Sequence, residues 1–311
     1  MLRFAPVALA ALLLVSTAAA FVYTEKLKLT PNPILGPRVD KVFSPVCECR
    51  SDVARISFRL REGDRISVGM VDGDGDPVRE LVRNRKAPRG RVTVIWDGRD
   101  DAGAVVPEGR YRPRVRLLEQ RRTITLPNPI RVDVTPPRFE AFSVRPRRIS
   151  PDGDGRRERV VARYQLSEKA RVSLYVDGVR RGQKLRRDPE GAIRWYGRID
   201  GVPVPAGTYS LTLGARDVAG NAASRPRPVT VLVRYVVLGR DRIETRPGAR
   251  FAVLVLSDAA RVEWRLGARS GSARPGTLKL LAPPRQGRFT LTVSANGFAA
   301  RAAVIVRDPD A

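Results

Sequence analysis

Residues 96–111 read WDGRDDAGAVVPEGRY, and residues 195–209 read WYGRIDGVPVPAGTY. Both stretches begin with Trp, pass through a Gly-containing segment and end in Pro-x-Gly-x-Tyr. The second follows the first by about 100 residues, the length of one β-sandwich domain. A Trp at the end of a strand, a tight turn and a second ring fit a sandwich corner in which both rings fill the core. The predicted core positions of the two copies are Trp96, Tyr111, Trp195 and Tyr209.

The sequence around these copies is a series of short strands. Residues 54–60, ARISFRL, alternate apolar and polar side chains, and the same period of two recurs at 171–176, 209–215 and 289–295. Alternation over such lengths predicts half-buried strands, and turn residues separate them every 8–12 residues or so. Beyond the N-terminal segment we expect no long helix. The fold class is therefore predicted to be all-β, with tandem β-sandwiches behind an N-terminal hydrophobic helix.

The repeat and the strand pattern predict the domain organisation. The last part of the chain lacks the Trp-x-Gly signature, and its assignment as a smaller β-sandwich rests on periodicity alone. The predicted segments are 1–25 (signal anchor or signal peptide), 26–40 (linker), 41–134 and 135–233 (the two repeat domains), 234–307 (the smaller sandwich) and 308–311 (tail).

Over residues 41–233 the sequence resembles the Ig-like domain of the flagellar hook-capping protein (FlgD-type), a module found in tandem in exported bacterial surface proteins. The first copy carries the resemblance most fully, and the Ser-Pro-Asp-Gly-Asp-Gly run at 150–155 matches the usual start of such a module. The second copy departs from the pattern, since Tyr196 and Ile199 stand where Asp is usual. The resemblance implies Ig-like β-sandwiches that bind, space or scaffold and carry no chemistry.

The segment 4–23, FAPVALAALLLVSTAAAFVY, contains no charged residue. Its length is sufficient for a membrane-spanning helix, and the run continues to Tyr23, a residue suited to the membrane interface. The small residues 18–20 also fit a secretory signal peptide that is cleaved. A buried core helix is the third alternative. An anchor places the bulk of the chain outside the cytoplasmic membrane, and a cleaved signal makes the protein secreted.

The chain is strongly basic. Lys+Arg number 58 against 32 Asp+Glu, which gives a net charge of +26, and seven of the basic residues are Lys. A surplus of this size is expected of a protein that binds polyanions. The arginines are nevertheless dispersed between apolar residues, which favours the solvated faces of strands, and the skew toward Arg is typical of a GC-rich genome. A surface that binds a cell-wall polymer or nucleic acid stays open as an alternative.

The composition argues against an enzyme. Histidine is absent, so Ser-His-Asp triads, Cys-His pairs, His-ligated zinc and a His general base are excluded. The two cysteines, Cys47 and Cys49, are too few for a zinc site of their own. If the chain is exported, a local disulfide between them or an intermolecular one is expected, because exported thiols are oxidised.

Two acidic runs have the oxygen ligands and glycines of a calcium site. The first is formed by Asp152, Asp154 and Glu158 at the start of the second copy, and the other is the run DGDGD at 72–76. Neither is an EF-hand, three arginines flank the first, and the second lies where a hairpin turn is needed. An ordinary turn is therefore the favoured reading of both runs. No other cofactor is expected.

Taken together, these features predict a non-catalytic, exported and membrane-anchored module of the bacterial cell surface that binds, spaces or scaffolds. The expected partners are the membrane, through residues 4–23, and a protein or a cell-envelope polymer, whereas nucleic acid is not expected. A polyanion binder that uses its arginines, or an accessory subunit of an exported enzyme complex, are the alternatives.

Overall fold

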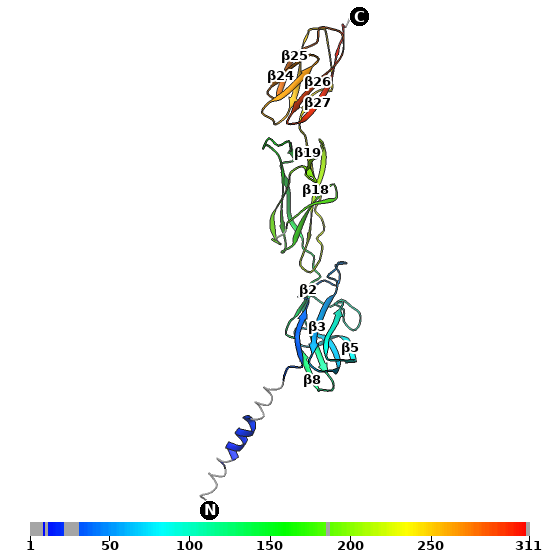
Figure 1. Ribbon diagram of the computed structural model, residues 1–311, viewed down its shortest axis with the longest axis vertical. Coiled ribbons are helices and arrows are strands. Elements are labelled where there is room, and N and C mark those ends of the chain that lie inside the picture. Colours follow the sequence, from blue (N-terminus) through cyan, green and yellow to red (C-terminus); the bar gives the residue numbers. More distant parts are fainter. Residues whose placement is uncertain (1–8, 10–11, 22–30, 185–186, 309–311) are drawn as a thin grey trace, which may run out of the picture. The chain divides into compact units, whose positions relative to one another are not determined.

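A computed structural model describes residue 9 and residues 12–21, 31–184 and 187–308. Residues 12–21 are helical, and from residue 31 onward the described chain consists of strands and the turns between them, as Figure 1 shows. The prediction of an all-β fold is thereby confirmed. No described helix has the length and apolar character needed to cross a membrane. The proposed anchor, residues 4–23, extends beyond the described residues on both sides of that helix.

The chain divides into two compact units, Met1–Val134 and Thr135–Ala311. In the first unit, one three-stranded sheet and one larger sheet enclose a single hydrophobic core. The small sheet has the order β1 (Ile34–Val39), β3 (Ala54–Leu60), β6 (Gly90–Trp96). The large sheet has the order β2 (Val42–Phe43), β9 (Ile130–Val132), β7 (Gly109–Leu117), β4 (Asp64–Val71), β5 (Pro77–Ala87), and β8 (Arg122–Thr125) also pairs with β7.

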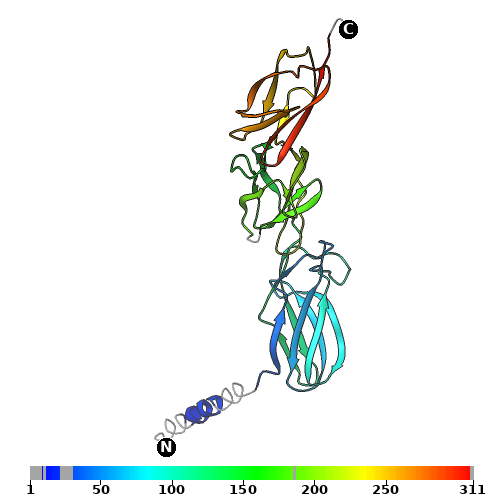
Figure 2. The same cartoon turned by 45° about the horizontal axis from the view of Figure 1, so that its top comes forward.

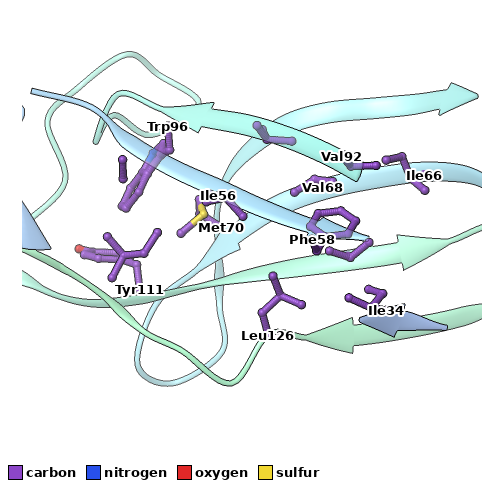
Figure 3. Packing of buried hydrophobic residues seen from close by; sticks show 14 of the residues in the cluster. Ile34, Ile56, Phe58, Ile66, Val68, Met70, Val92, Trp96, Tyr111 and Leu126 are labelled. Atoms are coloured by element: carbon purple, nitrogen blue, oxygen red, sulfur yellow. The ribbon is translucent and has the colours of Figure 1, made fainter. Parts of the chain in front are cut away.

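Period-two alternation explains why these strands enclose a core. In β3, Ile56, Phe58 and Leu60 are buried, while Arg55 and Arg59 on the other face are exposed. Figure 3 shows the apolar side chains from both sheets meeting between the ribbons, with Trp96 and Tyr111 at one end of the core. Figure 2 gives a second view, in which the long strands of this unit run side by side. Burial of one face of each strand thus fixes the register of the sheets.

The predicted linker at residues 26–40 is wrong over its second half. Residues 34–39 form β1, which pairs antiparallel with β3, and Ile34 is buried. This segment contains Gly36 and Pro37. They are compatible with an edge strand, because only one side of such a strand needs backbone hydrogen bonds, and a register shift lies between Leu35 and Arg38. Residues 22–30 lie outside the described residues.

The second unit contains two further sets of strands, each around its own core. In the first set, the three-stranded sheet has the order β10 (Phe139–Arg145), β12 (Val160–Leu166), β15 (Glu190–Trp195). The five-stranded sheet has the order β11 (Arg148–Ile149), β19 (Val229–Val233), β18 (Gly207–Arg216), β13 (Arg171–Val176), β14 (Val179–Gln183). A separate pair is formed by β16 (Arg198–Ile199) and β17 (Val202–Pro203). In the second set, the corresponding sheets are β20 (Val237–Leu238), β22 (Arg250–Leu256), β25 (Gly276–Leu281) and β21 (Arg242–Thr245), β27 (Phe298–Val306), β26 (Gly287–Ala295), β23 (Val262–Leu266), β24 (Arg269–Ala273).

All three sets of strands have the same topology. In each, a short strand near the start pairs in parallel with the last strand of the set, as β2 does with β9, β11 with β19 and β21 with β27. The third set therefore has the layout of the first two, although its sequence lacks the Trp-x-Gly signature.

Candidate functional site

The first copy of the repeat forms a corner built around Trp96. Its ring is fully buried at the end of β6 and meets Tyr111 and Phe43 edge-on, with ring centroids 5.2 and 5.4 Å away. Its Nε1–H donates to the carbonyl of Arg99 over 3.0 Å, and the Tyr111 hydroxyl donates to the carbonyl of Pro107 over 2.8 Å. Both polar tips are thus satisfied by the backbone of the segment between the rings, and burial raises the pKa of Tyr111.

The second copy repeats this corner with the same bonds. The Trp195 Nε1–H donates to the carbonyl of Arg198 over 3.1 Å, and the Tyr209 hydroxyl donates to the carbonyl of Pro205 over 2.9 Å. The two rings lie 5.4 Å apart. Trp195 is buried, whereas Tyr209 is half-buried, and burial raises the pKa of its hydroxyl. The motif residues of both copies therefore act in packing and in backbone capping.

The glycine two residues after each Trp explains the rest of the motif. Gly98 and Gly197 have φ angles of 71° and 61°, in the left-handed region. A Cβ at Gly98 would lie 2.8 Å from Pro45 Cβ, and a Cβ at Gly197 would lie 2.5 Å from Pro151 Cγ. Both the backbone conformation and the close approach of a proline therefore require glycine at these positions.

The acidic run at 72–76 forms a turn between β4 and β5. The Asp72 Oδ1 accepts hydrogen bonds from the amides of Asp74, Gly75 and Asp76, at 2.8–3.1 Å. This carboxylate oxygen is used in shaping the turn, as the sequence favoured.

At the start of the second copy, the predicted ligands are also bonded to the backbone. The Glu158 Oε1 accepts the amides of Gly153 and Gly155, at 2.8 and 3.1 Å, and the Asp154 Oδ1 accepts the amide of Arg156 at 2.7 Å. These bonds shape the turn through the backbone amides that the carboxylates accept. Glu158 is not part of the carboxylate cluster at this turn.

The structure adds a residue that the sequence analysis did not single out. Asp258 brings a carboxylate to within 4.8 Å of those of Asp152 and Asp154. Both carboxylate oxygens of Asp258 are buried, and no group in the described part of the chain reaches them with hydrogen-bonding geometry. Burial raises the pKa of Asp258, and repulsion from the other two carboxylates adds to the rise, while the nearby Ser150 hydroxyl offsets part of it. Three converging carboxylates, one of them buried, are groups that could hold a hard cation such as calcium.

The contacts that bring Asp258 to this turn lie within the second unit. The Arg156 guanidinium donates to the Asp258 backbone carbonyl over 3.2 Å, and the rings of Tyr235 and Phe298 stack with centroids 3.6 Å apart. Burial raises the pKa of Tyr235 to about 12. A cavity of about 260 Å³ is lined by Asp258 together with Arg148, Arg157 and Arg234. Asp258 lies far from Asp152 in sequence and in no acidic run, so no local pattern could have identified it.

Cys47 and Cys49 form a disulfide in the loop between β2 and β3. The same loop is closed by a backbone hydrogen bond of 3.1 Å from the Ser44 amide to the Ser51 carbonyl. This loop occupies the place in the first copy that the acidic turn occupies in the second.

Comparison with known proteins finds only weak likenesses to solved structures. A scan against protein-family models and a search of curated proteins gave no match. Among solved structures, fibronectin(III)-like modules of Clostridium thermocellum CbhA align at 18% identity and a TM-score of 0.35, over 64% of this chain and 93% of theirs. A bacterial ice-binding adhesin of 1.5 MDa aligns at 12% identity and a TM-score of 0.28, over 89% of this chain and all of the other.

A BSP domain of a biofilm-associated protein aligns at 15% identity and a TM-score of 0.23. The alignment covers 64% of this chain and 29% of the other chain, so less than a third of that chain is matched. At identities and TM-scores this low, the likenesses carry no argument about fold or function.

Proposed function

We propose that this chain is a non-catalytic, exported module of the bacterial cell surface, in which Ig-like β-sandwiches of the flagellar hook-capping type act as a binding, spacing or scaffolding element. The N-terminal segment 4–23 holds it in the membrane, with the bulk of the chain on the outer side. If the segment is cleaved, the same module is secreted.

The repeated corner is the observation that carries this proposal. The most distinctive side chains of the sequence, Trp96 and Tyr111 with their counterparts in the second copy, pack in cores and donate to nearby carbonyls. Core packing and hydrogen bonds to the backbone therefore explain why these four side chains are present. The lack of histidine removes the commonest general base, which further favours a non-catalytic module.

The location is tested with the full chain expressed in a bacterial host. We expect it to stay in the membrane pellet after carbonate extraction and to be trimmed by protease added to spheroplasts. The variant Leu13→Lys, Leu14→Lys serves as the negative comparison. It should impair membrane insertion, because charged residues in the centre of a spanning helix are energetically unfavourable. A wild-type chain that is protected from protease and recovered with the cytoplasmic proteins would overturn the proposed location.

A further inference from the structure

We propose that the outer face of the large sheet in the first unit binds a linear anionic polysaccharide. The inference rests on the proposed function, since it assumes that this face meets polymers of the cell envelope. We call this surface the arginine face and define it by six basic residues of β4, β5 and β7: Arg65, Lys86, Arg110, Arg112, Arg114 and Arg116.

The core forces the arginines of β7 onto one face. Tyr111, Pro113, Val115 and Leu117 are buried, so the four arginines that alternate with them point outward. Successive outward positions on a strand lie about 6.8 Å apart, and the four span roughly 20 Å. A row of evenly spaced positive charges of this length can face several negative charges of an extended polyanion at once.

The neighbouring strands add further basic residues beside this row of arginines and do not neutralise its charge. Arg65 of β4 lies directly opposite Lys86 of β5. Arg116 of β7 lies opposite Ser67 and is a diagonal neighbour of Arg65, at roughly 7–8 Å. Like charges directly opposite each other destabilise a sheet, and an anionic ligand relieves that repulsion. The folded chain therefore carries a cost on this face that ligand binding removes.

Two carboxylates beside the face, those of Glu80 and Asp72, are engaged elsewhere. Glu80, opposite Gly69 in the register of β4 and β5, pairs with Arg83 at 2.5 Å. Asp72, beyond the end of β4, caps backbone amides. Within the described residues, no ion pair joins a carboxylate to any of the six residues that define the arginine face.

Two of the six side chains are held in place by neutral partners. The Arg114 guanidinium donates to the Gly75 carbonyl over 3.1 Å and to the Thr125 hydroxyl over 3.4 Å. The Arg65 guanidinium donates to the Asn84 side chain over 2.9 Å. Neutral acceptors thus orient these two guanidinium groups, and neither of them forms an ion pair among the described residues.

The opposite side of the same sandwich has a different character. On the outer face of the small sheet, Arg59 lies opposite Arg91, but Ser57 lies opposite Thr93 and Arg55 lies opposite Ile95. The Ile95 side chain is 54% exposed. This mixed surface provides a control face within one folded unit.

The chemistry of the arginine face favours a polysaccharide over single-stranded nucleic acid. Proteins that bind single strands stack bases on aromatic side chains. The outward positions of β7 and their cross-strand partners on β4 and β8 are Arg, Thr, Ser, Gly and Val, and none is aromatic. The face therefore offers charge without a stacking platform.

The test measures binding of the full chain, purified in detergent, to heparin over a range of salt concentrations. The variant Arg65→Gln, Arg112→Gln, Arg116→Gln is compared with the matched variant Arg55→Gln, Arg59→Gln, Arg91→Gln. We expect the first to reduce the slope of log K against log salt by about three, one for each charge removed, and to weaken binding at every salt concentration. The matched variant should change the slope by less than one.

Equal losses in both variants would overturn the arginine face, because binding would then follow net charge alone. Tighter binding of single-stranded oligo(dT) than of heparin, lost in the same variant, would overturn the polysaccharide. Unchanged melting temperatures establish that both variants fold. The heparin assay measures binding to the arginine face independently of the location of the protein. A chain that binds heparin but fractionates with the cytoplasmic proteins would therefore refute the proposed location without refuting the arginine face.

Discussion

The two copies of the repeat share a corner and differ in the loop that opens each domain. At the corner, both copies have the same Trp, Gly, Pro and Tyr residues, and the Trp and Tyr side chains donate the same hydrogen bonds to the backbone. In the opening loop, the first copy has the Cys47–Cys49 disulfide, whereas the second has Glu158 capping two amides. Core packing therefore dictates the corner, and the opening loop is free to be closed by different chemistry.

The corners also differ in how completely they are packed. Trp96 has no exposed surface and touches two rings, while Trp195 is 4% exposed and has one ring neighbour among the described residues. In the second copy the place of Phe43 near the glycine is taken by Ile149. The first corner should thus contribute more to stability than the second.

Removing the two tryptophans gives the largest expected effect. Trp96→Ala should lower the free energy of unfolding of the first unit by about 3–5 kcal/mol, and Trp195→Ala should lower that of the second unit by an amount near the bottom of this range. Denaturant unfolding followed by circular dichroism measures both. A larger loss for Trp195→Ala, or melts that match the wild type, would contradict the packing comparison.

Substituting the glycine after Trp96 distinguishes the cost of a left-handed backbone from the cost of a steric clash at Cβ. Gly98→Ala should cost about 2–3 kcal/mol, because it combines the left-handed backbone with a Cβ that meets Pro45. Gly103→Ala is the matched control: its φ is 84°, but a Cβ there meets nothing within 4 Å. The control should cost about 1–2 kcal/mol. Equal losses would mean that the proline contact has no energetic weight.

Reduction of the disulfide tests the opening loop of the first copy. It closes a very short loop, so the chain-entropy account gives only about 1–2 kcal/mol. Dithiothreitol, or Cys47→Ser with Cys49→Ser, should lower the melting temperature of the first unit slightly. The second unit is the internal control and should not respond. A loss as large as that of Trp96→Ala would show that the loop, and not the corner, holds this copy together.

The sequence predicted much of this comparison because its signals are local. Period-two alternation identifies strands such as β3 and β7, and the repeat identifies both corners without any knowledge of contacts. The predicted linker failed at β1, where Pro and Gly conceal an edge strand. The third set of strands was predicted from periodicity alone, and its shared topology emerges only when the pairing is seen.

The site could be predicted only in part, and the reason is distance along the chain. Asp152 and Asp154 stand out as an acidic run, but the carboxylate that joins them, Asp258, comes from a different set of strands. The arginine face likewise needs the register between β4, β5 and β7, because dispersed arginines in the sequence do not reveal which of them become neighbours.

The smallest expected effect concerns Asp258. This residue joins the carboxylates at the opening turn of the second copy, and among the residues that the structure describes the opening loop of the first copy has no such cluster. The pKa of Asp258 is raised in the folded chain, so the folded state binds the proton more tightly than the unfolded state. That stabilisation is fully present below the unfolded pKa and is lost as the pH rises through the folded pKa. Without added calcium, Asp258→Asn should therefore raise the melting temperature of the second unit slightly at neutral pH, and the difference from wild type should shrink on acidification. A variant that melts lower at neutral pH in chelator would contradict this account.

Calcium sharpens the same comparison, because a ligand that binds only the folded state stabilises it by mass action. We expect millimolar calcium to raise the melting temperature of the wild-type second unit, since an ion offsets the repulsion among Asp152, Asp154 and Asp258. Asp258→Asn should lose this increment. Glu158→Gln should keep it, because Glu158 caps the Gly153 and Gly155 amides instead of joining the cluster. Identical melts of the wild type in calcium and in chelator would mean that these carboxylates only shape the turn.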